Sequence, residues 1–124
     1  MKALEDQPAA VLAFSDVFSG EAVARYTELD GVVDRVQRSR RIIRKRGLWW
    51  IPNRGLFRAD AARRVGGMRR HLAREYKADW PWLLHLALLG EFVRVPEPLI
   101  RKVWSDASLS AQWKRPLTLW WSTA

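Results

Sequence analysis

Hydrophobic positions along the first third of the chain change from an unbroken run to a helical spacing. Residues 9–14 are apolar without interruption after a proline, which predicts a buried strand. Residues 17–26 extend that strand or form a second, weaker one. The apolar residues Val32, Val36 and Ile43 then recur at the spacing of one helix face, so we expect a helix here.

Short segments follow in the middle of the chain. Residues 48–51 and 55–58 predict two extended pieces separated by a turn. Asp60 is a favourable helix N-cap, and the helix that it opens is expected to stop at the glycine pair 66–67. Residues 69–76 fit either a loop or a single helical turn.

A longer helix and one or two strands are predicted after this point. Asp79 is expected to cap a helix that ends at Gly90, because an aspartate carboxylate accepts the first backbone N–H groups of a helix. Residues 92–95 then predict a strand that Pro96 halts, and residues 99–104 predict a further strand or an edge.

The order of these segments is strand, helix, strand, helix, helix, strand, strand. This order indicates an α/β fold with a mixed sheet and flanking helices. With 124 residues the chain is one domain or a fragment of one. It divides into a strand with its connection (1–30), a basic helix (31–47), a core (48–104) and a tail (105–124).

Positive charge is concentrated in the middle of the chain. The sequence holds 22 Lys and Arg against 13 Asp and Glu, and fourteen of the cations lie in residues 35–74 beside a single acid, Asp60. Such a block attracts polyanions, phosphate groups or anionic lipid. Its densest part, residues 34–46, is either a binding surface or the solvated face of an amphipathic helix.

Composition excludes or disfavours several classes of site. The chain has no cysteine, so it holds no disulfide, no Cys-type zinc site and no thiol nucleophile, and its two histidines disfavour a His-rich metal site. The longest apolar run, residues 82–89, is far shorter than the roughly 20 residues that span a bilayer. We therefore expect a cytoplasmic protein, whose basic helix allows peripheral contact with an anionic membrane surface.

Asp79 carries the clearest catalytic chemistry, although a helix cap is the simpler interpretation of its position. A carboxylate held at a helix N-terminus between Trp80 and Trp82 can serve as a general base. Glu75, four residues earlier, adds a second carboxylate that can share acid and base roles or bind a cation. Residues 49–50 are both tryptophan, which fits a core position or a platform for a sugar ring.

Four segments of the second half resemble family 2 glycosyltransferases, in the same order and at similar spacings. They are a Gly-Leu-Phe-Arg segment with a following helix and Gly-Gly turn (55–67), an acidic residue that opens a Leu-rich helix (78–84), a strand ending in Val-Pro-Glu-Pro-Leu (89–99) and a Ser-Leu-Ser element (108–110). The opening run AAVLAFSD also resembles the strand that follows the metal-binding segment of these enzymes. The resemblance covers about residues 5–112.

This resemblance implies a partial GT-A fold, which is Rossmann-like, without the N-terminal nucleotide-binding half. It implies the acceptor-side part of an inverting hexosyltransferase, which moves a sugar from a nucleotide-diphospho-sugar donor to a hydroxyl of a glycan or lipid acceptor. Asp79 matches the position of the family's general base. The residues expected to contact the acceptor are Glu75, Trp80, Gly55 and Arg58.

The chain departs from the family in its donor-binding features. It contains no Asp-x-Asp motif and no preceding βαβαβ unit, the parts that hold Mn²⁺ or Mg²⁺ on the donor diphosphate in this family. We therefore expect no metal in this chain and no sugar transfer by it alone. Two alternatives stay open: a basic nucleic-acid-binding module, although no motif predicts a specific nucleic acid, and a peripheral membrane-binding domain.

Overall fold

The computed structural model describes residues 2–45, 48–69 and 78–108. Its elements follow in this order: α1 (Lys2–Glu5), β1 (Ala10–Ser19), β2 (Ala22–Ala24), η1 (Thr27–Leu29), α2 (Arg35–Arg44), η2 (Pro52–Arg54), β3 (Leu56–Phe57), α3 (Ala59–Val65), α4 (Asp79–Leu89) and β4 (Glu91–Lys102). Within these three ranges, none of the helices combines the length and the apolar character that crossing a membrane requires.

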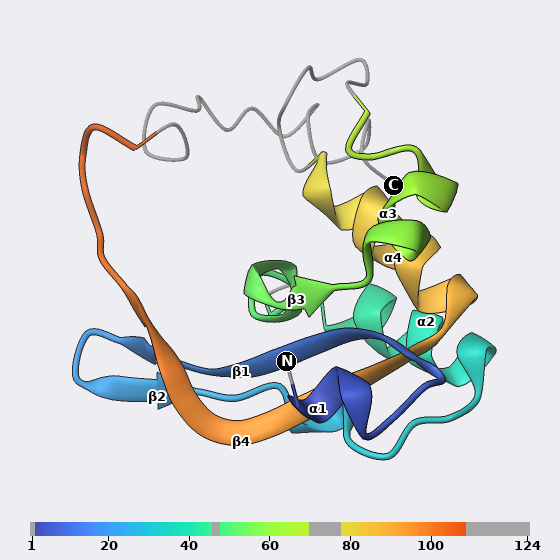
Figure 1. The fold of residues 1–124 in the computed structure, drawn as a ribbon. Coiled ribbons are helices and arrows are strands. Elements are labelled where there is room, and N and C mark those ends of the chain that lie inside the picture. The colour runs from blue at the N-terminus through green and yellow to red at the C-terminus, as the bar shows by residue number, and fades with distance from the viewer. Residues whose placement is uncertain (1, 46–47, 70–77, 109–124) are drawn as a thin grey trace.

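β1 is the central strand of a mixed, open sheet (Figure 1). β4 runs parallel to β1 along one edge, and their ladder begins at Ala10 and Glu91 and ends at Ser19 and Lys102. On the other edge, β3 pairs antiparallel with the first half of β1, and β2 pairs antiparallel with its second half. The predicted α/β class, with a mixed sheet and flanking helices, is confirmed, and it is compatible with a partial Rossmann-like fold.

β4 continues through Pro96 and Pro98, so the prediction that the first proline halts the strand is wrong. Proline cannot donate a ladder hydrogen bond, but it is tolerated on an edge strand or at a bulge. The register of the β1–β4 ladder shifts at this point, where the neighbours Ser15 and Asp16 pair with Val95 and Pro98. The bulge absorbs the additional residues of β4, and the two segments predicted separately form one strand.

The hydrophobic core lies between the sheet and the helices, and α4 packs against α2, α3 and β1 (Figure 1). α4 is buried on most of its surface, which explains why its sequence is apolar almost throughout. Each packed element contributes side chains that are buried almost completely. They include Leu12 of β1, Ile42 of α2, Leu83 and Leu86 of α4, and Phe92 of β4.

α2 buries a different face from the one that the apolar spacing predicts. Val36 and Ile43 are 48% and 41% exposed, whereas Arg38 and Ile42 are buried. Arg38 and Ile42 are four residues apart and therefore lie on the same face of the helix. Asp34 caps this helix, because its carboxylate accepts a hydrogen bond from the Gln37 N–H at 2.7 Å.

Arg38 is a buried cation whose hydrogen bonds go to backbone carbonyl groups. Its Nη1 donates to Val32 O at 2.7 Å and to Val33 O at 3.2 Å, and its Nε donates to Ala87 O at 3.0 Å. Burial lowers the pKa of Arg38, and nearby carboxylates oppose that shift. Because Ala87 lies in the last turn of α4, Arg38 satisfies a carbonyl near the end of that helix and joins α2 to α4.

We expect Arg38→Met to lower the free energy of unfolding by about 2–4 kcal/mol, because buried carbonyl groups lose their donor. Arg35→Met, at an exposed position of the same helix, should change it by no more than about 0.5 kcal/mol. Urea denaturation followed by tryptophan fluorescence measures both values. Equal effects of the two substitutions would contradict the structural role of Arg38.

Two further local predictions differ from the structure. Arg58, not Asp60, is the N-cap residue of α3, and Asp60 lies within the first turn, where its negative charge still suits the helix dipole. Residues 48–51 form turns instead of an extended segment. The predicted end of α3 is confirmed, since Gly66 caps it in the left-handed conformation.

Candidate functional site

A cavity of about 300 Å³ lies between the sheet and the segment that joins η2 to β3. Its walls come from the middle of β1, from Val95, Leu99 and Ile100 of β4, from residue Ala3 and from residues 54–56. The lining is apolar except for Ser15 and Arg54. This volume and this lining are typical of sites for small molecules, in which a few polar groups orient the ligand.

Two cations and two indoles form a basic–aromatic cluster that includes Arg54 of the cavity wall. The Lys102 Nζ lies 4.5 Å from the ring centre of Trp50 and 3.5 Å from that of Trp104. The Arg54 Cζ lies 5.1 Å from the ring centre of Trp50, and its Nη1 donates to the Trp50 carbonyl at 2.7 Å. Contacts of this kind hold a cation by its attraction to the face of the indole ring.

The two cations of the cluster repel one another. Burial lowers the pKa of Lys102, and the positive charge of Arg54 lowers it further. An anion bound between the two side chains would relieve this repulsion. Lys102 is the last residue of β4, and ligands of open α/β sheets bind beyond the carboxyl ends of the strands. The cluster is therefore a candidate site for an anionic group.

The sequence predicted that Asp79 is the N-cap of α4, and this prediction is wrong. Asp79 is the first residue of this helix. Ala78 occupies the cap position and makes no side-chain cap hydrogen bond. The Asp79 Oδ2 instead accepts a hydrogen bond from the Asn53 Nδ2 at 2.7 Å. Asn53 precedes Arg54 in η2, and burial lowers the pKa of Arg54 while the charge of Asp79 opposes that shift. The carboxylate therefore lies close to the arginine of the cavity wall.

Gly55 lines the cavity and lies against β1. A Cβ atom at this position would lie 2.4 Å from the Ala13 carbonyl oxygen, a distance that such atoms do not adopt. Only glycine therefore allows η2 to approach the central strand this closely. A larger residue would push the segment away from β1 and alter the wall of the cavity.

The other residues expected to contact an acceptor have mixed surroundings. Trp80 is buried in the core at 8% exposure. The Arg58 Nε donates to Ala10 O at 2.7 Å and its Nη2 donates to Leu4 O at 2.6 Å, so this side chain joins α1 to β1. Glu75 lies outside the described residues. Acceptor contact by these residues stays a prediction.

Part of the positive charge of α2 serves the fold. Arg38 is buried, the Arg41 Nη1 donates to the Glu28 carbonyl at 2.6 Å, and the Lys45 Nζ pairs with the Glu28 carboxylate at 2.7 Å. These contacts account for several cations of the basic helix without a ligand. Binding of nucleic acid or of anionic lipid by α2 stays a prediction.

Several residues of the candidate site have no signature in the sequence. The tryptophan pair 49–50 fitted either a core position or a platform, and Trp50 lies in the cluster. Asn53, Lys102 and Trp104 belong to no motif, and their contacts join positions that are far apart in the chain. Only the fold brings them together.

The part of the chain that the structure describes contains no group of three or more His, Cys, Asp or Glu side chains that could hold a metal ion. Comparisons of the chain with models of protein families, with curated proteins and with solved structures find no match. The function is therefore inferred from the residues of the site and from the motifs of the sequence.

Proposed function

We propose that the chain is the acceptor-side part of an inverting glycosyltransferase with a GT-A fold. It contributes to the transfer of a hexosyl group from a nucleotide-diphospho-sugar to a hydroxyl of a glycan or lipid acceptor. One observation carries the proposal. Asp79 matches the position of the general base in the family that the chain resembles. Asn53 holds its carboxylate beside Arg54, the arginine in the wall of a ligand-sized cavity.

The proposed chemistry needs a carboxylate in a fixed position. Asp79 takes the proton of the acceptor hydroxyl as the acceptor oxygen attacks the anomeric carbon of the donor sugar. The bond from that carbon to the diphosphate breaks on the opposite face, so the configuration inverts. The hydrogen bond from Asn53 orients the carboxylate, and its place in the first turn of α4 restricts its motion.

The basic–aromatic cluster supports the donor side of the same reaction. Arg54 and Lys102 place two positive charges where a diphosphate leaving group can be stabilised. The indoles of Trp50 and Trp104 offer flat faces that suit a sugar ring or a base. The described residues hold no group of three or more His, Cys, Asp or Glu side chains, and we assign no step of the reaction to a metal held by this chain.

We expect uridine diphosphate to bind the chain weakly, and Lys102→Met to reduce its affinity about tenfold or more, because one charge-assisted contact is lost. Lys45→Met, which removes the same charge at the C-cap of α2, is the matched control and should leave the affinity unchanged within about twofold. Isothermal titration calorimetry measures both. Equal affinities of the Lys102 variant and the parent would exclude the cluster as the diphosphate site.

The same binding should depend on pH. The ammonium of Lys102 binds a diphosphate only in its charged form, so affinity should fall as the pH rises through the pKa of this group. Burial and Arg54 place that pKa below the ordinary lysine value. In Lys102→Met this part of the pH dependence should disappear.

A further inference from the structure

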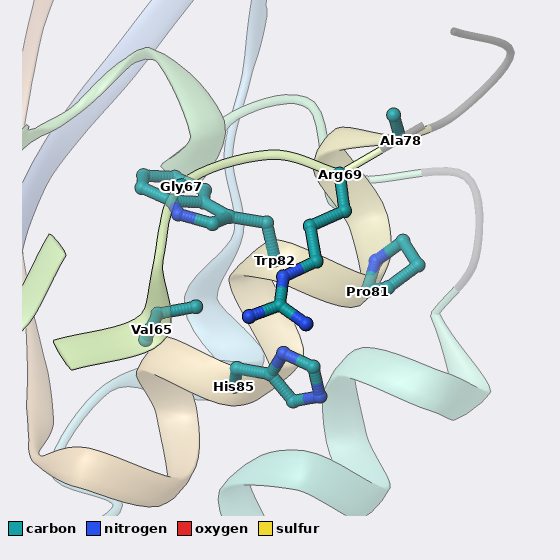
Figure 2. Close-up of a pocket in the computed structure, with 7 residues that line it drawn as sticks. All are labelled: Val65, Gly67, Arg69, Ala78, Pro81, Trp82 and His85. Atoms are coloured by element: carbon teal, nitrogen blue, oxygen red, sulfur yellow. The ribbon is translucent and has the colours of Figure 1, made fainter. Parts of the chain in front are cut away.

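We infer that a second, smaller hollow on α4 binds a phosphate group, and that the acceptor of the proposed reaction carries this group. The assignment to the acceptor rests on the proposed function, whereas the binding site itself does not. The hollow has a volume of about 50 Å³ and lies between the end of α3 and the first turns of α4 (Figure 2). It is separate from the basic–aromatic cluster.

Three side chains with N–H donors line this hollow. Figure 2 shows the guanidinium of Arg69 between the indole of Trp82 and the imidazole of His85. Arg69 supplies a fixed positive charge and several donors, and a histidine ring donates at least one N–H in either protonation state. The other lining residues, among them Val65 and Pro81, are apolar or lack a side chain that could accept a hydrogen bond.

These donors have no partner within residues 2–45, 48–69 and 78–108. Trp82 is only 4% exposed, and its Nε1 is buried without a hydrogen bond. Within the same ranges, no carboxylate or carbonyl group accepts a hydrogen bond from Arg69 or from His85. Arg69 and His85 are exposed, so only the buried Trp82 N–H costs free energy without an acceptor, and a ligand that supplies oxygen acceptors would satisfy that donor while contacting the other two side chains.

The local backbone brings Arg69 to this position. Gly66 and Gly67 have φ angles of 82° and 75°, in the left-handed region that favours glycine. The chain can therefore turn sharply after α3 and direct Arg69 back towards α4. The Arg69 Nη2 would lie only 3.2 Å from a Cβ atom at residue 66, so the glycine also makes room for the guanidinium.

Size and charge select the ligand. About 10–15 Å³ of such volume accommodates one water molecule, so 50 Å³ accommodates a group of a few atoms such as a phosphate, while the rest of a larger ligand would extend out of the hollow. An arginine fork and neutral N–H donors suit the oxygens of a phosphate, which accept several hydrogen bonds at once.

The hollow is adjacent to the proposed base along the helix. Ala78 and Pro81 line it and flank Asp79 in the sequence, while the Asp79 carboxylate bonds to Asn53. A phosphate seated between Arg69 and His85 would thus hold the acceptor within one turn of the residue that takes its proton. The acceptor class that fits is a phosphate monoester, either a soluble sugar phosphate or a lipid phosphate.

The test follows the indole N–H signal of Trp82 in ¹H–¹⁵N NMR spectra, assigned with Trp82→Phe. Inorganic phosphate is titrated into the 124-residue chain, with sodium chloride at equal ionic strength as reference. We expect a saturable shift with phosphate and none with chloride. Arg69→Gln should weaken binding about tenfold or more, since the charge-assisted contacts are lost. Arg40→Gln on α2 is the matched control and should bind like the parent.

Two further binding measurements identify the kind of molecule that carries the phosphate. An Arg69-dependent shift with glucose 6-phosphate supports a soluble acceptor, and Arg69-dependent binding to phosphatidate vesicles supports a lipid acceptor. His85→Leu provides a second variant at an exposed position, and circular dichroism checks that each variant is folded. Absence of any saturable shift, or equal affinity of the parent and Arg69→Gln, would overturn the inference.

The two proposals can fail separately. Phosphate binding at Trp82 requires no sugar transfer, so its absence would leave the role of Asp79 untouched. Conversely, Arg69-dependent phosphate binding in a protein whose Asp79→Asn variant transfers sugar normally would keep this site and remove the assignment to an acceptor.

Discussion

Replacing Asp16 by alanine is expected to lower the free energy of unfolding by about 3–5 kcal/mol. This is a large part of the total free energy of unfolding of a domain of this size. The Asp16 side chain is almost completely buried, and its oxygens accept hydrogen bonds from the Arg94 Nε and Nη2, each at 2.7 Å. These bonds join β1 to β4 at the bulge, and pairing with Asp16 raises the pKa of Arg94. The alanine variant would leave a largely buried guanidinium without its main partner.

Two other variants separate the buried pair from the rest of the network. Asp30→Ala removes the exposed partner of the Arg94 Nη1, at 2.8 Å, and should cost no more than about 1 kcal/mol. The double variant Asp16→Leu with Arg94→Met should recover much of the stability, because neither charge is then buried alone. Urea denaturation measures all three. An Asp16→Ala variant within about 1 kcal/mol of the parent would show that the pair contributes little.

Asp79→Asn is expected to lower turnover by about 10²-fold or more while leaving the fold intact. The measurement needs a chain in which a family 2 nucleotide-binding half with an Asp-x-Asp motif precedes residue 1. Asparagine can still accept the hydrogen bond from Asn53, but it cannot take a proton from an acceptor hydroxyl. The loss should therefore appear in kcat, with little change in the free energy of unfolding.

Two controls distinguish the base from a structural carboxylate. Asp79→Ala should add a loss of about 1 kcal/mol in stability, because the Asn53 amide loses its acceptor. Asn53→Ala should lower kcat less than Asp79→Asn does, since the carboxylate remains but is less well oriented. If Asp79→Asn retains nearly full activity, Asp79 is structural and Glu75 becomes the next candidate.

The parts of the fold that follow a local period could be predicted from the sequence. All but the first residue of the apolar run 9–14 lie in β1, and the helix predicted after Asp79 is α4. Both depend on residues that are neighbours along the chain, and their apolar character reflects burial on most sides. The parallel pairing of β1 with β4 is non-local, and the order of the segments indicated only a mixed sheet, not which strands pair in it.

The failures share a physical cause, which is that the deciding partner is distant in sequence. Arg38 is buried because carbonyl groups of α4 and of the loop before α2 accept its hydrogen bonds, and no local pattern marks this. Pro96 does not halt β4, because the bulge opposite Ser15 absorbs it.

The candidate site was predictable only in part, for the same reason. Asp79 and Trp50 carried signals of type and position. The hydrogen bond from Asn53 and the contact of Lys102 with two indoles required the fold.

The most direct test of the proposed function is the anomeric configuration of the product. The chain joined to the nucleotide-binding half is incubated with a panel of uridine and guanosine diphospho-sugars and with simple glycan and phosphate-bearing acceptors, and products are examined by ¹H NMR. We expect transfer with inversion at the anomeric carbon, and no transfer by residues 1–124 alone. Transfer with retention, or inversion that Asp79→Asn leaves at full rate, would contradict the assignment of this chain as the acceptor-side part that supplies the base.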